Sequence, residues 1–484
     1  MDTTQLEKLR PCGRLETYST ARHHLGFYNN VGLTATYTTP STSGSSLEIS
    51  VYAALHHVIA DHPNLSAIPI HEDKSFPEVY FVRLPEVDLS TCVEFRTREA
   101  AISPDNMNDE DLDEMLHKQH SRNFENKSGR TPYWRLVITT SPKSPSAFNA
   151  SWFFHHALAD GTSAMLFHES FVEGLNAASI NQGVDRIVSS PHTPLPPPLE
   201  ELHPMTMSWS FFLRALAGSV LPSYFAQRSP QLWTGGLVPA EAVPTKSKHH
   251  SLAIPASTTK AFATKCRSEN TSVTAALSAL IAVGISERIQ VGTLGERKEI
   301  RVDTPISLRP FLDVPAGRMI NAITNASFTY TMPSRAPGAG QPEGEDNKHA
   351  KLSWEQARQM KNGLRKEVEK KGADNLIALF KYVSDMPAFF LSQLGKPRPT
   401  SVELSNLGVW RGRTGTDGQQ GKWKIGRMAF SQSVNHTSAP ISVSVVTGGD
   451  GCLSLTFCCA NDDAWIADVI EELESNIAIL AHGE

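Results

Sequence analysis

The chain has 484 residues and a mass of 53.0 kDa, enough for two or three domains of ordinary size. Hydrophobic residues make up 40% of it and charged residues 20%, a globular balance that excludes wholesale disorder, a collagen helix and a long coiled coil. The formal net charge is −5 and no long basic run occurs, so nucleic acid is not expected as a partner.

Cysteine usage and hydropathy bear on the compartment. The six cysteines have neither disulfide-framework nor zinc-ligand spacing, so we expect reduced, buried thiols in a cytoplasmic protein. No signal peptide and no membrane span of ~20 apolar residues is expected. The nearest approach to a span, Trp209 to Phe225, is interrupted by Arg214 and Pro222. It predicts a buried helix, with a helix lying on a membrane surface, and hence a peripheral membrane protein, as the alternative.

The first half of the chain alternates helical and strand patterns. Phe148, Ala150, Trp152 and Phe154 alternate with polar residues, which predicts the second strand of a hairpin with one buried face. The expected helices cover 47–58, 109–124 and 160–175, and the expected strands cover 65–70, 79–84, 133–140 and 147–154.

The second half begins after a proline-rich stretch at 181–205, which is typical of a semi-rigid spacer. We therefore expect an N-terminal domain over 1–185, a crossover linker with one apolar helix over 186–250, and a C-terminal domain over 251–484. A segment rich in proline, glycine and charge at 332–349 predicts a surface loop. The expected helices cover 257–269, 271–289, 353–371 and 376–394, with a last one capped by Asp462 or Asp463, and the expected strands cover 299–306, 320–331, 401–409, 428–433, 440–447 and 453–459.

The most informative motif joins the hairpin to the following helix. It reads Phe153-Phe154-His155-His156-Ala157-Leu158-Ala159-Asp160-Gly161. A histidine at a strand end is held by the sheet while its ring reaches a cavity, and its ordinary pKa near neutrality suits it to act as a base toward a hydroxyl or amine. A glycine after the acid leaves room where a Cβ would crowd the turn.

This segment resembles the His-His-x-x-x-Asp-Gly motif of the CoA-dependent acyltransferase superfamily. The stretch from Gly13 to Asn30 is similar to the N-terminal signature of fungal alcohol O-acetyltransferases, Ser307-Leu308-Arg309-Pro310-Phe311 to the superfamily's Arg-Pro element, and Ser405-Asn406-Leu407-Gly408 to its crossover-strand element. The Asp-Phe-Gly-Trp-Gly element of plant relatives is absent. The resemblance implies an α/β fold of two chloramphenicol-acetyltransferase-like domains, with mixed sheets flanked by helices and an active-site tunnel at their interface.

The resemblance also implies a chemistry. His156 takes the proton of an acceptor hydroxyl, whose oxygen attacks an acyl-CoA thioester, with acetyl-CoA as the expected co-substrate and no acyl-enzyme. Asp160 pairs with Arg309 to hold the motif loop that contains Gly161, and His155 is structural. The log of kcat/KM should rise with pH through an ionisation near that of free histidine. No permanent cofactor and no metal are implied, the acceptor is a small alcohol or a secondary-metabolite hydroxyl, and a monomer is expected.

Candidates for binding CoA are less well defined. CoA carries several phosphate charges, so Lys361 and Arg365, on one helix with Lys370 and Lys371, are candidate contacts. A solvated helix face is the simpler interpretation of these cations. Ser433 is a candidate donor to the oxyanion of the intermediate.

Three alternatives to this function remain open at this point. A condensation-type enzyme that uses a carrier-protein thioester would share the histidine motif, and a non-catalytic binding protein is a second possibility. A zinc site of His155, His156, Asp160 and His168 is a third. Two other histidine pairs, His56-His57 and His249-His250, are interpreted as solvated, while His23-His24 suits a substrate channel or packing equally.

Overall fold

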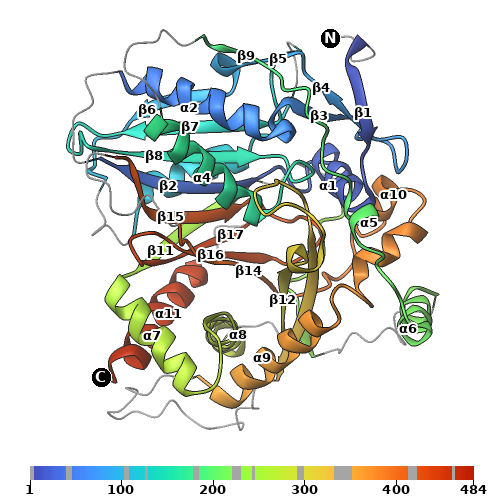
Figure 1. Ribbon diagram of the computed structural model, residues 1–484. Helices are drawn as coiled ribbons and strands as arrows, with labels where there is room; N and C mark the ends of the chain where they lie inside the picture. The colour runs from blue at the N-terminus through green and yellow to red at the C-terminus, as the bar shows by residue number, and fades with distance from the viewer. Residues whose placement is uncertain are drawn as a thin grey trace.

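Two β-sheets face each other across a central interface, and helices cover the outer face of each (Figure 1). The computed structural model describes residues 5–39, 46–102, 108–125, 129–177, 185–220, 231–241, 246–291, 299–331, 352–412, 422–460 and 464–483. The expected loop at 332–349 and the expected caps Asp462 and Asp463 lie outside these ranges. The architecture is the mixed α/β fold that the resemblance implies.

The first sheet is built mainly from the N-terminal part of the chain. Apolar residues of β8 (Ala147–Phe154), among them Phe148, Trp152 and Phe154, are buried in a core shared with the two helices α2 (Leu47–Asp61) and α4 (Gly161–Ala177). β8 forms the predicted antiparallel hairpin with β7 (Trp134–Thr140). In spatial order the strands are β15 (Lys424–Gln432), β2 (Val31–Thr38), β8 (Ala147–Phe154), β7 (Trp134–Thr140) and β6 (Val93–Thr97).

The second sheet is larger and mixed, with a second hydrophobic core on its outer side. Val302, Leu404, Val443 and Leu455 pack there, against α7 (Ala256–Ser268), α8 (Val273–Val291), α9 (Trp354–Glu369) and α11 (Ala464–His482). The strand order is β10 (Leu232–Trp233), β12 (Glu299–Ser307), β14 (Val402–Val409), β16 (Ile441–Thr447), β17 (Leu453–Cys459) and β11 (Lys248–Ile254), with β13 (Ile323–Thr331) also paired to β12.

Smaller elements surround these sheets. A three-stranded sheet and a two-stranded one flank the first sheet, and α3 (Glu110–His120) contacts β11. The remaining elements are β1 (Glu7–Pro11), α1 (Arg14–His24), η2 (Pro63–Ser66), β3 (Ala67–Ile70), β4 (Tyr80–Arg83), β5 (Glu86–Asp88), η3 (Leu89–Thr91), β9 (Ile187–Ser189), α5 (Leu199–Leu202) and η4 (Arg309–Phe311).

The C-terminal half of the sequence contributes one strand to the first sheet. β15 pairs with β2 although its sequence neighbours β14 and β16 lie in the other sheet. β11 begins at Lys248, inside the stretch expected to be linker. The division into domains at residues 185 and 250 therefore stays a prediction. The pairing of β15 with β2 shows that the C-terminal part of the chain completes the first sheet.

Two local predictions need correction. The helix expected over 376–394 is two short elements, η5 (Leu376–Tyr382) and α10 (Met386–Leu391). Asp385 begins the second by accepting the amide of Ala388 at 2.9 Å, and Pro387 cannot donate to a helix continuing from before. His249, expected in a solvated linker, is buried in β11 and stacks on His120 at 4.7 Å.

The apolar helix α6 (Trp209–Val220) is not buried as predicted. Trp209 is 80% and Leu213 56% exposed, and the helix stands away from the sheets (Figure 1). It meets η5, where the ring of Phe212 lies 5.1 Å from that of Tyr382. In the described ranges no single helix is long and apolar enough to cross a membrane, and α7 with Val273–Ile289 reaches that length only as a pair bent by 97°. All six cysteines are buried and free, as expected.

Candidate active site

The site forms where three strands of the first sheet end together. Val31 at the start of β2 lies opposite Phe154 at the end of β8, and also opposite Gln432 at the end of β15. The residues next to these positions are therefore neighbours at one sheet edge: His155-His156 after β8, Asn29-Asn30 before β2 and Ser433 after β15. The sheet fixes their backbone, which suits a site that must hold its groups in a set geometry.

His156 presents one ring nitrogen as a free base. Its Nδ1 lies 3.0 Å from the carbonyl oxygen of Ala159, so Nδ1 carries the proton and donates it there. No partner for Nε2 is found among the described residues, so its lone pair is available there. Asn321 Nδ2 donates to the His156 carbonyl oxygen at 2.8 Å and holds the turn. The Tyr28 ring lies 5.8 Å from the imidazole.

Burial keeps this base neutral. Desolvation, and next the positive charge of Arg22, lower the pKa of His156 to about 4. Arg22 itself is 6% exposed and lies between the rings of Tyr18 and Tyr28, at 4.2 and 4.5 Å. At neutral pH the imidazole is therefore ready to accept a proton.

The pH dependence of activity should reflect this shift. We expect kcat/KM to be constant above about pH 6 and to fall below it with a midpoint near the pKa of about 4, not near 6.5. Burial also lowers the pKa values of His155, His168 and His249 to about 4. The unfolded chain takes up these protons near pH 6.5, so stability present above that pH is lost as the pH falls toward 4. Brief exposure to acid followed by assay at pH 7 controls for unfolding, and a reversible midpoint near 6.5 would contradict the account.

The predicted ion pair between Asp160 and Arg309 is confirmed. Arg309 Nη2 lies 2.8 Å from Asp160 Oδ1, which also accepts from the Ser163 amide at 2.8 Å and so caps α4. Oδ2 accepts the Ala322 amide at 3.2 Å. Arg309 begins η4 directly beyond β12, so the pair ties the motif turn of one sheet to a strand end of the other.

Gly161 lies at a close contact between the two sheets. A Cβ at this position would collide with Cδ2 of Leu407, which extends from β14. The space left by the missing Cβ of Gly161 is thus occupied by the Leu407 side chain of the second sheet. Leu407 packs against the core of the first sheet.

Ser433 lies at the same sheet edge as the histidines, with the start of β2 between them. Its Oγ accepts the amides of Asn29 and Asn30 at 2.9 and 3.2 Å, and the residue is 1% exposed. Its hydroxyl proton has no acceptor in the part of the chain that the structure describes. Two amides pointing at the oxygen polarise the hydroxyl and make it a better donor.

Lys361 and Arg365 are not brought to this site. They lie on α9, which packs on α8 and β13 on the outer side of the second sheet. Lys361 Nζ donates to the carbonyl of Asn270 at 3.1 Å, and Arg365 pairs with Glu369 at 3.6 Å at the surface. Their contact with CoA stays a prediction, which this placement does not favour.

The zinc alternative does not fit the arrangement. His168 points to the helix side of the first sheet, where Nδ1 meets Tyr37 Oη at 2.8 Å and Nε2 meets the Leu33 carbonyl at 2.9 Å. Asp160 is occupied by Arg309 and two amides. The ligand atoms of Asp160 and His168 are therefore committed to other partners.

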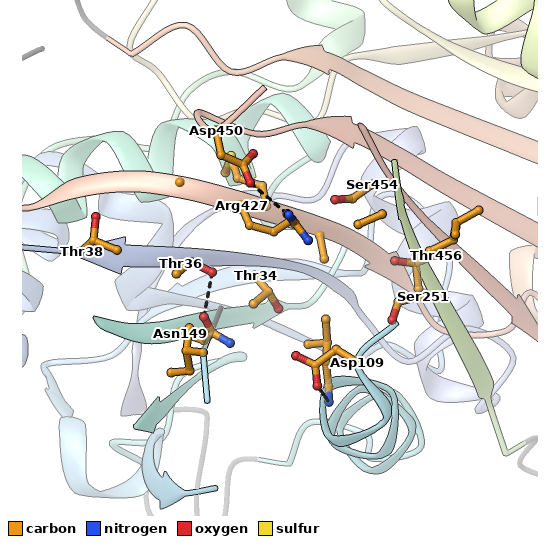
Figure 2. Close-up of a pocket in the computed structure, with 17 residues that line it drawn as sticks. Thr34, Thr36, Thr38, Asp109, Asn149, Ser251, Arg427, Asp450, Ser454 and Thr456 are labelled. Atoms are coloured by element: carbon orange, nitrogen blue, oxygen red, sulfur yellow. Dashed lines mark hydrogen bonds and ion pairs between the residues drawn. The ribbon is translucent and has the colours of Figure 1, made fainter. Parts of the chain in front are cut away.

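A cavity of about 270 Å³ lies between the two sheets (Figure 2). Arg427 and Asp450 form an ion pair at 2.9 Å in its wall. Thr36 in this wall is opposite Asn149, which at ~3.3 Å per residue is roughly 20 Å along β8 from His156. Hydroxyl groups dominate the polar lining: Thr34, Thr36 and Thr38 of β2, Ser251 of β11, and Ser454 and Thr456 of β17.

Sequence reasoning missed several residues that the fold places here. Arg22 and Tyr28 lie inside the Gly13–Asn30 stretch, so the resemblance pointed to the region but not to these side chains. Asn321 and Glu72 carried no sequence signal. Glu72 contacts His155 and is described below.

Paired sheets whose interface is crossed by the Asp160–Arg309 contact place the protein in the chloramphenicol-acetyltransferase and condensation-domain fold class. The structure matches trichothecene 15-O-acetyltransferase TRI3 of Fusarium sporotrichioides with a TM-score of 0.66 and 12% identity, over 98% of this chain and 95% of that one. The first condensation domain of the CDA synthetase matches with a TM-score of 0.59 and 11% identity, over 99% and 96%. At such identities these matches show the fold.

Sequence comparison narrows the class to a family. The family model described as alcohol acetyltransferase matches residues 11–480. The probable alcohol acetyltransferase crmB of Aspergillus fumigatus is 33% identical over 95% of both chains. The probable alcohol acetyltransferase FCK4 of Fusarium pseudograminearum is 26% identical over 97% of this chain and 94% of that one. The chain belongs to the alcohol acetyltransferase family and is an acyltransferase.

Proposed function

We propose that the protein transfers an acetyl group from acetyl-CoA directly to an alcohol, with His156 as the general base. The observation that carries this proposal is the His156 imidazole: its Nδ1 is committed to Ala159 and its pKa is lowered to about 4, so Nε2 is free and neutral. A neutral imidazole is a competent base for a hydroxyl that attacks a thioester.

The proposed reaction needs two bond changes at one carbon. Nε2 of His156 takes the hydroxyl proton as the alcohol oxygen bonds to the thioester carbonyl carbon, which gives a tetrahedral oxyanion. The Ser433 hydroxyl donates to this oxyanion. The carbon–sulfur bond then breaks, and the imidazolium returns its proton to the departing thiolate, so CoA and the ester leave and the enzyme is unchanged.

We place the two substrates along the interface between the sheets. The cavity of about 270 Å³ opens along β2, the strand whose other end meets the turn of His156. We propose that this cavity, with its hydroxyl-rich lining, forms one arm of a tunnel that leads toward His156. The acceptor is a volatile alcohol or a hydroxyl of a secondary metabolite, in keeping with the names of the relatives.

The condensation-type alternative draws on the same histidine and the same fold. It would require an acyl group on a carrier protein. The family match over residues 11–480 favours an alcohol acetyltransferase over a condensation-type enzyme. A non-catalytic binding protein would not require an accessible His156 ring nitrogen next to the Asp160–Arg309 ion pair.

Thiol release tests the proposal. With purified protein, acetyl-CoA and a panel of alcohols, we expect free CoA and the acetate ester in equal amounts without any carrier protein. Activity only with an acylated carrier protein would favour the condensation-type enzyme, and no ester from any donor would favour the binding protein.

A further inference from the structure

A buried carboxylate lies between two histidines beside the proposed base. Glu72, in the loop after β3, approaches His23 Nδ1 with Oε2 at 2.6 Å and His155 Nε2 with Oε1 at 3.1 Å. The side chains of His23 and His155 are 3% and 1% exposed, and that of Glu72 is 12% exposed. The proposed mechanism uses none of these groups.

Backbone amides fix which nitrogen of each ring carries the proton. The Phe124 amide donates to His23 Nε2 at 3.2 Å, and the Ala157 amide donates to His155 Nδ1 at 2.9 Å. A nitrogen that accepts an N–H has no proton of its own, so the proton of each neutral ring is on the other nitrogen. In both rings that nitrogen faces Glu72: His23 Nδ1 is hydrogen-bonded to Oε2, and His155 Nε2 lies 3.1 Å from Oε1, within ion-pair distance.

The same geometry disfavours a metal ion, although two histidines and a glutamate are suitable ligand types. A metal would need lone pairs on His23 Nδ1 and His155 Nε2. The protons would then move to the nitrogens that face the amides of Phe124 and Ala157, and each amide would meet another donor. Protonation of either ring would likewise place a ring N–H against the amide of Phe124 or Ala157.

Charges in the cluster agree with this assignment. Burial alone would raise the pKa of Glu72, but the two histidines more than offset it and lower that pKa to about 2. Burial lowers the pKa of His155 to about 4. At neutral pH Glu72 is thus an anion beside the neutral ring of His155. His23 accepts the Phe124 amide at Nε2 and contacts Glu72 through Nδ1.

The cluster connects two segments that form the active site. His23 lies in the last turn of α1 directly after Arg22, whose guanidinium contacts the ring of Tyr28. His155 directly precedes His156. We propose that Glu72 is a positioning residue that holds His156 through His155, and Arg22 through His23. This inference rests on the proposed role of His156.

Substitution of Glu72 by glutamine provides the test. The amide offers one oxygen and one NH2 group, so one histidine loses its acceptor and meets a donor instead. We expect kcat to fall about 10- to 100-fold, within the range of mispositioned catalytic groups, while KM for acetyl-CoA changes less than about threefold. Glu72→Asp keeps two acceptor oxygens and should lose less. Glu78→Gln, the same change at an exposed position of the same loop, should have no effect.

Coupling to His155 separates positioning from general stability. In a His155→Ala background, Glu72→Gln should lower kcat much less than in the wild type, because the connection is already broken. Added Zn²⁺ should not raise activity, and purified protein should carry no stoichiometric zinc.

Several outcomes would overturn the inference. These are wild-type kcat in Glu72→Gln, equal losses in the Asp and Gln variants, an undiminished loss in the His155→Ala background, or zinc-dependent activity. An inactive His156→Ala variant together with a fully active Glu72→Gln variant would refute this inference alone. An active His156→Ala variant would instead refute the proposed function.

Discussion

Replacement of His156 by alanine should lower kcat by about two to four orders of magnitude, the usual contribution of a positioned general base. The side chain makes its close polar contact with the Ala159 carbonyl, and Asn321 binds the backbone oxygen, which alanine retains. The variant should therefore fold. Steady-state kinetics with acetyl-CoA and an alcohol, together with circular dichroism, measure both properties.

Two other histidine substitutions serve as controls. His57→Ala removes a side chain that is 40% exposed and should leave kcat unchanged. His155→Ala should lower kcat less than His156→Ala, because it disturbs the base without removing it. Near-wild-type turnover in His156→Ala would refute the mechanism.

Asp160→Asn and Arg309→Ala should each lower both stability and activity. Breaking a buried ion pair by removing one partner typically costs ~3–5 kcal/mol, and Asp160 is 1% exposed while Arg309 is 16% exposed. Arg309 also donates to the carbonyls of Arg318 and Ile320 at 2.8 and 2.9 Å. Loss of either partner should loosen the junction between the two sheets.

The double variant should be little worse than either single variant, because one contact is lost in all three. Urea unfolding gives the stability cycle, and kcat/KM gives the activity cycle. Arg365→Ala, which removes a surface pair with Glu369, should cost no more than ~1 kcal/mol. Strictly additive losses in the Asp160 and Arg309 cycle would contradict the proposed coupling.

Local patterns predicted the elements around the motif well. Alternation along 147–154 predicted β8, but its second face, with Asn149 and Ser151, is buried as well, contrary to the prediction of one buried face. The residues after it predicted the turn and α4. The Asp160–Arg309 contact was also predicted, but through the resemblance. No local pattern indicates that an aspartate at a helix cap pairs with an arginine of another sheet.

Long-range pairing explains most of what sequence reasoning missed. Nothing local showed that β2 lies between β8 and β15, although Val31, Leu33, Ala35 and Tyr37 alternate with glycine and threonine as in a strand with one buried face. His249 is buried because β11 lies at the edge of the second sheet against α3 and His120. Glu72 meets His23 and His155 only in the folded chain, so its charge carried no signal.

The prediction that α6 is buried failed for a different reason. Its composition is that of a core helix, and hydropathy alone cannot tell whether a neighbouring element covers it. Trp209 and Leu213 remain exposed because the described contacts of α6 lie mainly near its N-terminal turn.

Direct transfer without an acyl-enzyme is the central claim, and initial rates with acetyl-CoA and alcohol both varied test it most directly. The motif contains a base and no nucleophilic serine or cysteine, and all six cysteines are buried. Both substrates must therefore bind together, and reciprocal plots should intersect. Parallel plots, with an acetyl group found on the protein after incubation with acetyl-CoA alone, would contradict the account.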